Sequence, residues 1–554
     1  MKKLFIFSLA LILFASCKKD SSSNKPAGTP FKFVSASVNN VPINGLNAFN
    51  VNANPVIAIT FSAPIDTTTT AANISLTGNS NTLAIHYSYA NNDSTLIIQS
   101  NTPLQTLSNY TLTVLEYLKS KTDSILKVNT YVHLITAIDS TDKFQQISDS
   151  ALLTLVQQQT FKYFWDNANP VSGMARERNS DAVTDATGGT GFGVMGIITG
   201  VNRNFISRTQ ATTRLLTLVN FLNDTTKVKR YHGAFSHWIN GATGATIPFG
   251  TLDNGGDIVE TSYLLEGLLC ARQYFNNTAD ANETSLRNTI DSIWYHVDWN
   301  WYRQNNQNVL TWNWSPNYNW SINVQVSGWD EALITYVLAA SSPTNAIPKI
   351  VYDNGWAHNG GMKNGNKYYG YTLPLGPDKG GPLFFEHYSF MGINPNGLAD
   401  AYAKYDTQTV NHSQINYQYC IANPHGYYGY SSQCWGLTAS DVPSGYNANE
   451  PDNDIGVISP TAAVSSLPYT PVASMQAIRF FYYKLGDKLW GQYGFKDAFS
   501  LQQLWFDNDY LAIDQGPQIA MIENYRSGLL WSLFTSCPEI KTGLQNLGFT
   551  APYL

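Results

Sequence analysis

From about residue 145 onward, this chain alternates amphipathic helical segments with long loops rich in Gly, Asn, Pro and Tyr. Residues 215–222 place four apolar side chains at the i, i+3, i+4, i+7 spacing of a half-buried helix. We expect about ten to twelve helices, including 148–165, 258–275 and 517–534, with no alternating βαβ pattern. This leaves a bundle, a solenoid or a toroid of helical hairpins. Loops rich in acids and aromatics favour the toroid, because its loops converge on one central cleft.

Residues 31–137 have a different texture, with short segments rich in β-branched and aromatic residues between Asn, Ser and Pro turns. Such segments at this spacing predict a β-sandwich. The stretch 55–78 resembles the bacterial Ig-like domains found between anchors and enzymes. We interpret the unit as a spacer or accessory module, with sugar binding as the alternative. The predicted strands are 56–61, 83–87, 95–99 and 110–114.

The N-terminus has the pattern of a signal peptide over residues 1–16, with two lysines, a short apolar run and then Ser16. Cys17 stands where the lipobox of bacterial lipoproteins has its acylated cysteine, and residues 17–30 form a polar tether. An ordinary signal peptide with an incidental cysteine is the alternative. We therefore expect an exported lipoprotein in the outer membrane or periplasm, with the cell surface as a further option. No second long apolar run follows, so we expect a chain anchored to the membrane and not spanning it.

The composition indicates a neutral, polar ligand. Charged residues make up only 13% of the chain against a usual share of about 25%. Aromatic residues also reach 13%, with 14 Trp and 33 Tyr. The net charge of −6 provides no basic surface and argues against a nucleic-acid partner. Sugar rings present apolar faces to aromatic side chains and hydroxyl groups to Asn, Asp and Glu.

The cysteines other than Cys17 show no metal-site spacing. Cys270, Cys420, Cys434 and Cys537 form no CxxC pair and no Cys/His cluster, so we predict neither a metal nor a cofactor. Export permits a disulfide, for which Cys420 and Cys434 are the nearest pair, and buried free thiols are the equal alternative.

Three Gly-rich loops end in carboxylates just before a predicted helix, and they carry Asp253, Asp257, Glu260, Glu331 and Asp514. Asp257 and Glu260 have the spacing of a capping box. However, one helix start does not need three acids within eight residues, and the three repel unless something uses them. The alternative interpretation of Asp514 is a turn-forming residue. Carboxylates gathered in an aromatic-lined cleft are the minimum equipment for cleaving a glycosidic bond.

Glu331 has an unusual setting among these acids. Ser327 could cap the following helix, with Asp330 as its partner and Glu331 in the first turn. Tryptophans crowd the preceding segment, and a Glu against Trp loses hydration, which raises its pKa towards that of a general acid. The Trp-x-Trp at residues 312–314 is followed by turn formers. We interpret it as a sugar-stacking wall, with core packing as the alternative.

Several other residues are candidates for binding substrate. His387 has no second His at a metal-ligand spacing, so we interpret it as a hydrogen-bond donor to substrate, with a core histidine as the equal alternative. Glu523 and Arg526 are expected to form a structural ion pair on one helix. The candidate substrate-binding residues are Trp312, Trp314, Trp329, Arg176, His387, Tyr388, Trp435 and Tyr446.

Eight segments match the pattern of a known family: 161–165, 190–193, 255–263, 328–331, 382–390, 434–441, 459–463 and 513–516. On these segments, residues 145–554 resemble the glucoamylase-like domain of exported bacterial proteins and, within it, glycoside hydrolase family 144. The resemblance implies an (α/α)6 toroid that hydrolyses β-1,2-glucan to short oligosaccharides, with inversion at the anomeric carbon and no cofactor. It also implies that Asp253, Asp257, Glu260 and Glu331 lie in the catalytic cleft. Members divide between internal cleavage and release of disaccharide from a chain end.

Together these observations predict an all-β Ig-like sandwich at residues 31–137 and an all-α toroidal catalytic domain at 138–554. We expect a monomeric glycoside hydrolase with Glu331 as general acid. Asp514 is the preferred base, and Asp257 and Glu260 are its rivals. Two alternatives remain open. One is a glycan-binding lipoprotein without turnover, and the other is a transferase or phosphorylase on the same toroid, for which the arginines at 176 and 178 could contribute to an anion site.

Overall fold

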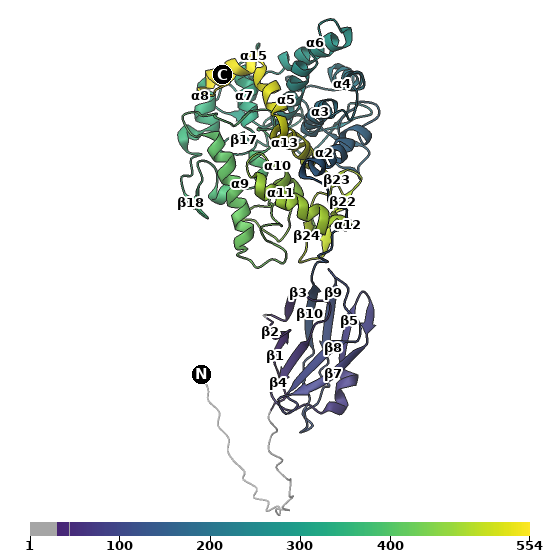
Figure 1. Cartoon of the computed structure of the whole chain (residues 1–554). Coiled ribbons are helices and arrows are strands. Elements are labelled where there is room, and N and C mark those ends of the chain that lie inside the picture. Colours follow the sequence, from purple (N-terminus) through teal and green to yellow (C-terminus); the bar gives the residue numbers. More distant parts are fainter. Residues whose placement is uncertain (1–29, 44) are drawn as a thin grey trace, which may run out of the picture. The chain divides into compact units, whose positions relative to one another are not determined.

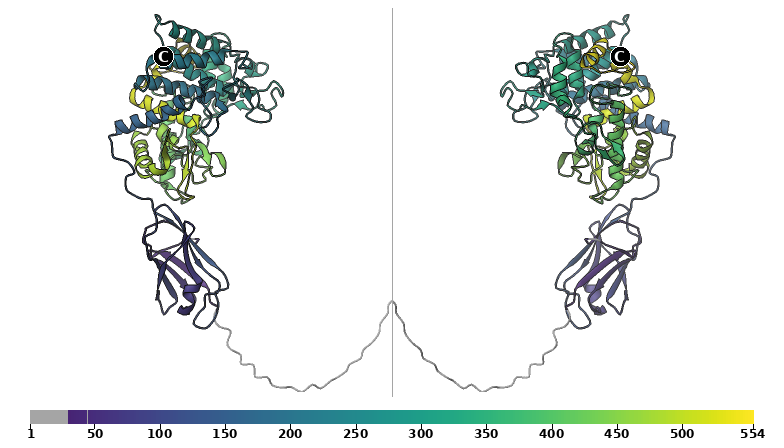
Figure 2. Two further views of the ribbon diagram at one scale, coloured as in Figure 1. Left: turned by 90° about the vertical axis from the view of Figure 1, so that its right-hand side faces the viewer. Right: turned by 90° about the vertical axis from the view of Figure 1, so that its left-hand side faces the viewer.

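The computed structural model describes residues 30–43 and 45–554, and the chain divides into two compact units between Ala137 and Ile138. The strands of one unit and the helices of the other are distinct in Figure 1, and the two further views of Figure 2 show the same separation of secondary structure. The predictions for the signal peptide, for Cys17 and for the tether fall on residues outside the described ranges. Within those ranges, no helix has both the length and the apolar character needed to cross a membrane.

The first unit is a sandwich of two five-stranded sheets, as the sequence predicts. The strand orders are β2-β1-β4-β8-β7 and β3-β10-β9-β5-β6, and all pairs are antiparallel except β10 with β3. Alternating side chains such as Ile59, Leu96, Leu112 and Leu134 are buried between the sheets. The strands are β1 (Phe33–Val38), β2 (Val41–Pro42), β3 (Asn47–Val51), β4 (Ile57–Phe61), β5 (Ile74–Gly78), β6 (Asn81–Leu83), β7 (Ile85–Ala90), β8 (Thr95–Ser100), β9 (Asn109–Val114) and β10 (Thr130–Thr136), with the short helix α1 (Thr70–Asn73) before β5.

The second unit is built from helices of two kinds. One kind is buried on nearly all sides: α3 (Thr187–Asn202), α5 (Ile258–Tyr274), α7 (Leu333–Ser341), α10 (Pro460–Ser465) and α13 (Ala512–Ser527). The other kind buries a narrower face and packs outside the first: α2 (Asp149–Asp166), α4 (Arg208–Asn223), α6 (Ala281–Tyr295), α9 (Tyr405–Ala422), α11 (Pro471–Arg479), α14 (Leu529–Ser536) and α15 (Pro538–Leu547). The short helices α8 (Lys349–Val351) and α12 (Gly486–Leu489) lie in connections.

The inner helices form a closed ring. In sequence order α3 packs on α5 and α5 on α7, while α10 packs on α13 and α13 returns to α3. Residues 383–393, which begin with the 3-10 turn η6 (Leu383–Glu386), close the gap between α7 and α10. Ser389 Oγ lies 3.0 Å from the Ile334 amide that donates to it, and His387 Nε2 lies 3.0 Å from Ser466 Oγ. The predicted toroid is therefore present, but a turn-rich segment holds one of its inner positions.

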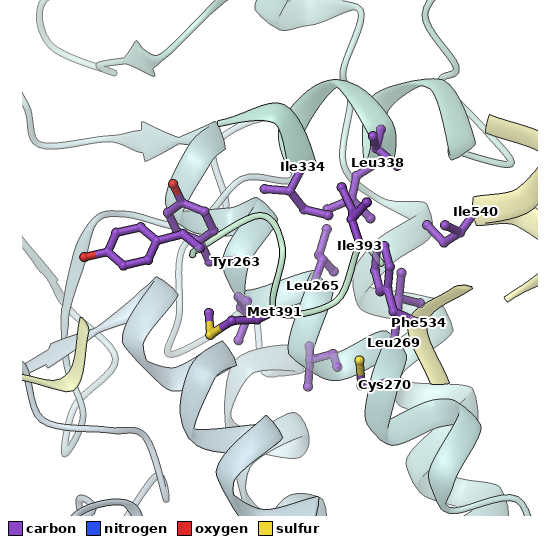
Figure 3. Packing of buried hydrophobic residues seen from close by; sticks show 14 of the residues in the cluster. Tyr263, Leu265, Leu269, Cys270, Ile334, Leu338, Met391, Ile393, Phe534 and Ile540 are labelled. Atoms are coloured by element: carbon purple, nitrogen blue, oxygen red, sulfur yellow. The ribbon is translucent and has the colours of Figure 1, made fainter. Parts of the chain in front are cut away.

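Glycine lets the first two inner helices approach closely. A Cβ built on Gly191 of α3 would lie 2.0 Å from the Tyr263 carbonyl oxygen of α5, and one on Gly267 of α5 would lie 2.0 Å from the Gly191 carbonyl oxygen. Any side chain at either position would force the two backbones apart. The surrounding apolar core is continuous. In Figure 3, Leu265 and Leu269 of α5 lie with Ile334 of α7 and Phe534 of α14.

Two of the expected helices match the structure and one does not. The segments 148–165 and 258–275 correspond to α2, which Ser148 caps, and to α5. The expected helix 517–534 begins earlier, at Ala512, so Pro517 is its sixth residue and not its start. It also ends at Gly528, whose φ of 66° is left-handed, and α14 follows as a separate helix.

Short paired strands lie in the loops between the helices. A three-stranded sheet is formed by β11 (Thr184–Ala186), β12 (Trp238–Asn240) and β13 (Thr246–Ile247). The strands β14 (Gly256–Asp257) and β16 (Asn313–Trp314) pair ahead of α5, and β20 (Ala439–Val442) and β21 (Gly445–Ala448) form a hairpin. The others are the pairs β15 (Leu310–Thr311) with β17 (Gln325–Val326), β18 (Lys367–Tyr368) with β19 (Tyr371–Thr372), β22 (Trp490–Gly491) with β23 (Gly494–Phe495), and β24 (Phe499–Ser500) with β25 (Trp505–Phe506).

Candidate active site

A cavity of about 380 Å³ lies where three inner helices begin. Gly189, Glu260 and Ile513 line it, and they belong to the first turns of α3, α5 and α13. Helix N-termini favour negative charge, so this end of the ring suits carboxylates. The remaining lining residues are Glu177, Arg178, Ala186, His237, Trp238, Phe249, Tyr446 and Leu511.

Asp257 caps α5, as the sequence allows, but the capping box is incomplete. Its Oδ1 accepts from the amides of Val259 at 3.0 Å and Glu260 at 2.9 Å, and its Oδ2 lies 3.0 Å from His237 Nδ1. Glu260 does not return to the Asp257 amide and instead accepts from the Gly188 amide of α3 at 2.7 Å. Asp257 is thus fully engaged in holding the helix start, whereas Glu260 is directed into the cavity.

His237 balances the charge of these acids. Burial opposes its charge, but Glu260, the hydrogen bond to Asp257 and the charges of Asp257 and Asp253 outweigh burial and raise the His237 pKa to about 9. The imidazolium is therefore charged at neutral pH. Burial raises the pKa of Glu260, while the charge of His237 opposes that rise.

Asp253 stands at the edge of the same loop. Its Oδ2 accepts from Asn313 Nδ2 at 3.0 Å, and its carbonyl oxygen accepts from the Phe249 amide at 2.9 Å. Burial and the neighbouring charge of Asp257 raise the pKa of Asp253 to about 6. The three acids that the sequence places on one loop are therefore neighbours around a single histidine.

Glu331 precedes its helix and does not stand in the first turn. Helix α7 begins at Leu333, and the Oδ1 of Asp330 accepts from the Ala332 amide at 2.8 Å. Ser327 does not cap the helix, because its hydroxyl donates to the Gly355 carbonyl oxygen at 2.5 Å. Burial, together with the charges of Glu260 and Asp257, raises the Glu331 pKa to about 7. That value keeps a fraction of the group protonated near neutral pH, as a general acid requires.

Asp514 lies in the first turn of α13 and is buried, with 1% of its surface exposed. Burial raises its pKa to about 7; the charges of Asp441 and Glu177 add to the rise, whereas Arg178 and a hydrogen bond from Asp497 oppose it. Among the described residues, no N–H group donates to Asp514 Oδ2. Of the three candidate bases, Asp514 has the carboxylate least engaged with backbone amides.

Tyr388 lies near Asp514 as well as near Glu331 and Glu260. Burial raises the pKa of this phenol, and the charges of Asp514, Glu331 and Glu260 raise it further. The ring packs on Phe192 of α3 and on Tyr263 of α5. Carboxylates from the first turns of α5 and α13 and from the segment before α7 therefore act electrostatically on one side chain.

Other predicted substrate-binding residues occupy different places. Tyr446 lines the cavity and is 52% exposed. Arg176 does not line it; its side chain lies beside Asn167, with NH1 at 3.4 Å from the Asn167 Oδ1. Arg178 lines it instead. Trp312 is half-buried and packs against the core of the second unit, and Trp314 packs edge-on against His232 at 5.0 Å.

Three predicted contacts with substrate are core residues. Trp329 is buried and donates to Glu386 Oε1 at 3.2 Å. Trp435 is fully buried and donates to the Ala473 carbonyl oxygen at 3.3 Å. His387 bonds to Ser466, and burial lowers its pKa to about 3, so it is a neutral core histidine. In each case the polar atom is satisfied inside the protein.

His237, Trp238 and Phe249 line the cavity, although sequence reasoning did not select them, and Arg178 was considered only for an anion site. The rings of His237 and Phe249 lie 4.1 Å apart, and those of Trp238 and Phe249 lie 4.9 Å apart. One signal was available, because this His-Trp pair and Phe249 stand shortly before the acid loop. The four cysteines of the described chain are buried free thiols, so the disulfide alternative for Cys420 and Cys434 is not present.

Comparison with known proteins defines the family. A family model described as "Putative glucoamylase" matches residues 323–538, and one described as "Bacterial Ig-like domain" matches residues 29–132. An endo-β-1,2-glucanase structure from Chitinophaga pinensis is 50% identical, covers 74% of this chain and 100% of its own, and has a TM-score of 0.72. The chain belongs to the glucoamylase-like family. Its Ig-like unit and helical unit confirm the resemblance inferred from sequence.

Two further relatives of this glucoamylase-like protein come from Parabacteroides distasonis. A β-1,2-glucanase structure is 36% identical, covers 93% of this chain and 72% of its own, and has a TM-score of 0.70. A curated exo-β-1,2-glucooligosaccharide sophorohydrolase that acts at the non-reducing end is 44% identical over 425 residues. That alignment covers 72% of this chain and 58% of the relative, so the chain spans little more than half the length of this curated protein.

Proposed function

We propose that the chain is a glycoside hydrolase that cleaves β-1,2-glucan into short oligosaccharides with inversion of the anomeric carbon. The observation that carries the proposal is the 50% identity to an endo-β-1,2-glucanase solved with sophorotriose and glucose, over the full length of that structure. Such chemistry needs carboxylates. Glu177 and Glu260 line the cavity at the start of α3, α5 and α13, whereas the half-buried Glu331 and the buried Asp514 lie beside it and are not among its lining residues.

The proposed reaction uses one proton donor and one proton acceptor. Glu331 gives its proton to the glycosidic oxygen as the bond from that oxygen to C1 breaks. A water oxygen bonds to C1 from the opposite face, and its proton passes to Asp514. The raised pKa of Glu331, about 7, supports the donor role. The free oxygen of Asp514 supports the acceptor role.

Asp257 and Glu260 are less suited than Asp514 to act as the base. Both oxygens of Asp257 are occupied by backbone amides and His237, so accepting a proton would cost the cap of α5. Glu260 keeps one oxygen on the Gly188 amide and faces the charged His237. We propose that Glu260, His237 and the exposed ring of Phe249 bind the sugar, since hydroxyl groups need acceptors and donors and sugar faces need aromatic rings.

The transferase or phosphorylase alternative is less well supported. Arg178, the lining arginine, already pairs with Glu177 at 2.8 Å, with Asp441 at 2.9 Å and with Asp509 at 3.2 Å. A cation held by three carboxylates offers little to a phosphate group. Turnover that depends on added inorganic phosphate would reverse this assessment.

The deciding experiment mixes the chain, truncated just after Cys17, with linear β-1,2-glucan and follows proton NMR from the first minutes. Early α-anomer in short products supports hydrolysis with inversion. Early β-anomer would contradict it, because retention requires a nucleophile in place of the base. Absence of cleavage, with β-1,3-, β-1,4- and α-glucans also inert, would favour the glycan-binding alternative. The size of the first products separates internal cleavage from disaccharide release.

We also propose that the protein is an exported lipoprotein anchored through Cys17. The basic start, the apolar run and the cysteine after Ser16 support this. Metabolic labelling with palmitate in a bacterial host tests it. Label that persists in a Cys17→Ser variant would refute it.

A further inference from the structure

Glu386 and His412 form a hydrogen-bonded pair inside the helical unit. Glu386 ends the turn η6, in the segment that closes the ring between α7 and α10, and His412 lies on the outer helix α9. Both side chains are fully buried, and Glu386 Oε1 lies 2.8 Å from His412 Nδ1. Neither residue lines the cavity. The proposed reaction does not use this pair, so its presence needs another explanation.

The contacts of the pair determine where its hydrogens lie. His412 Nε2 lies 3.0 Å from the Gly381 carbonyl oxygen, which can only accept. Its Nδ1 faces Glu386 Oε1, which also receives Gln408 Nε2 at 2.7 Å and Trp329 Nε1 at 3.2 Å. Both ring nitrogens therefore face acceptors, and only an imidazolium has two hydrogens to donate. The pair consists of a cation and a carboxylate.

The orientation of Gln408 supports this assignment. Its Oε1 accepts from the Leu375 amide at 2.9 Å, which leaves Nε2 to face Glu386. Glu386 Oε1 thus receives three N–H groups, one each from a tryptophan, a glutamine and a histidine. An ionised carboxylate has only acceptors, which suits an oxygen in this position.

The pair reaches the proposed general acid through Trp329. Trp329 stands two positions before Glu331, in the segment that precedes α7. The indole N–H is the single hydrogen-bond donor of this side chain, and Glu386 Oε1 is its acceptor. The ring also packs against Tyr405 of α9, with 5.8 Å between the ring centroids. Glu386 therefore fixes the direction of a side chain just ahead of the acid.

The same segment holds the backbone at Glu331 itself. Ser389, three positions after Glu386, donates to the Glu331 carbonyl oxygen and accepts from the Ile334 amide at 3.0 Å. The acid segment is thus held at residue 329 by Glu386 and at residues 331 and 334 by Ser389. Because Glu331 lies within these anchors, the position of its carboxyl group depends on them.

A glycine-containing loop encloses the network. Gly376 and Gly380 have φ angles of 99° and 105°, which glycine adopts without steric cost. A Cβ on Gly380 would lie 2.1 Å from His412 Cδ2, and one on Gly376 would lie 2.9 Å from Trp329 Cδ1. The loop backbone therefore packs directly on both rings and leaves them no room to shift.

Orientation explains the pair better than stability does. Desolvation offsets much of the attraction within a buried ion pair, and apolar residues of the same volume often stabilise a protein as well. We propose that Glu386 and His412 are positioning residues for the general acid: the imidazolium orients the Glu386 carboxylate, which anchors Trp329 and so holds Glu331 where it can protonate the glycosidic oxygen. The inference rests on the proposed function, in which Glu331 is the acid. No proton leaves either residue during the reaction.

Two substrates separate positioning of the acid from general damage. The sugar leaving group of β-1,2-glucan needs a proton from Glu331, whereas the β-fluoride of the β-1,2-linked glucose disaccharide has a leaving group that needs none. Trp329→Phe keeps a ring and removes the N–H, and Glu386→Gln removes the charge that pairs with His412. Each should lower kcat on glucan at least about tenfold, with KM little changed, and leave kcat on the fluoride within about threefold of wild type. Equal losses on both substrates, or no loss on either, would refute the proposal.

The two changes should not add. If Glu386 acts through Trp329, the double variant should lose no more than the more affected single variant, because both changes break one chain of contacts. A loss equal to the product of the two single losses would refute the proposal. Glu331→Gln on the same substrates tests the acid itself. Equal losses on both substrates in that variant would remove Glu331 as the acid, and the positioning role with it.

A matched control identifies effects of folding alone. Glu283 is a buried acid, 2% exposed, on the outer helix α6, and it pairs with Arg208 at 2.6 Å. Glu283→Gln should lower the melting temperature and leave the ratio of the two kcat values unchanged. A changed ratio in this variant would mean that the ratio reports damage to the fold, which would remove the support for positioning.

A second readout does not need activity. Nitrogen-15 NMR of the histidine-labelled chain at pH 7 should show a ring with both nitrogens protonated, and His412→Gln should lack that signal. A His412 ring with a single hydrogen would refute the proposal even if the chain proved not to be a hydrolase. A doubly protonated ring in a chain without turnover would leave the ion pair in place and show that the proposed function had failed, and the positioning of an acid with it.

Discussion

His237 should make the stability of the helical unit depend on pH in the neutral to alkaline range. The folded protein holds its pKa at about 9, against 6.5 for a free side chain. Each pKa unit corresponds to about 1.4 kcal/mol, so the difference amounts to about 3 kcal/mol in the free energy of unfolding. Only 22% of the side chain is exposed, so solvent screening removes little of this.

The sign follows from which state binds the proton more tightly. The folded state does, so the stabilisation is complete below pH 6.5 and is lost as the pH rises towards about 9. His237→Asn keeps a donor near Asp257 but has no charge to lose. Wild type should therefore lose about 3 kcal/mol relative to this variant between pH 6 and pH 9.5.

Urea unfolding followed by tryptophan fluorescence measures this difference. All 14 tryptophans lie within residues 165–531, so the fluorescence signal measures unfolding of the helical unit and not of the Ig-like unit. Parallel stability curves for wild type and His237→Asn would refute the reasoning. So would an NMR titration of the His237 ring with a pKa of 7 or lower, because it would mean that the three carboxylates do not act together on the imidazolium.

Four further outcomes are expected. Glu331→Gln should lower kcat on β-1,2-glucan by about 10²- to 10⁴-fold with little change in melting temperature; a loss below tenfold would remove Glu331 as the acid. The pH profile of wild-type kcat/KM should be a narrow bell centred near pH 7, because acid and base both have a pKa of about 7; a broad plateau would contradict this. Gly188→Ala should reduce activity because its Cβ would lie 2.6 Å from Glu260 Oε2, whereas Gly250→Ala meets nothing within 4 Å and should keep wild-type stability in the same thermal melts. Phe249→Ala should raise KM without changing the melting temperature, since the ring is 52% exposed and lines the cavity; an unchanged KM would mean that sugar does not stack there.

The sequence predicts the helices and the carboxylates better than the side chains around them. Helix periodicity and capping are local, so α5 and its Asp257 cap could be recognised from neighbouring residues. Burial is not local. Trp435 and His387 look the same in sequence as a sugar-binding Trp and His, but both are buried in the folded protein. Only the three-dimensional structure separates them from Trp238 and Phe249.

Long-range pairing explains the remaining differences. The expected ion pair within α13 does not form, because Glu523 pairs with Arg203 at 2.7 Å and Arg526 donates to Gln157 at 2.6 Å. These partners are more than 300 positions away in the chain. Asp497 and Asp514 are closer to each other in the sequence, but the strands between them contain no motif that predicts their contact. Spacing rules describe contacts within one helix. They do not predict side-chain partners that belong to another helix.

The contact between α13 and the segment before α3, which closes the ring of inner helices, has a consequence for folding. The Ala512 amide donates to the Glu177 carbonyl oxygen at 2.9 Å, and this contact joins residues 335 positions apart. Closing a flexible loop of that length costs about 5 kcal/mol of chain entropy, which the chain recovers only when the whole interface forms. A solenoid can gain function one repeat at a time, but a ring cannot. Asp514, the proposed base, lies beside Glu177 only when the first and last inner helices have met, so the site proposed for hydrolysis is complete only once the ring is closed.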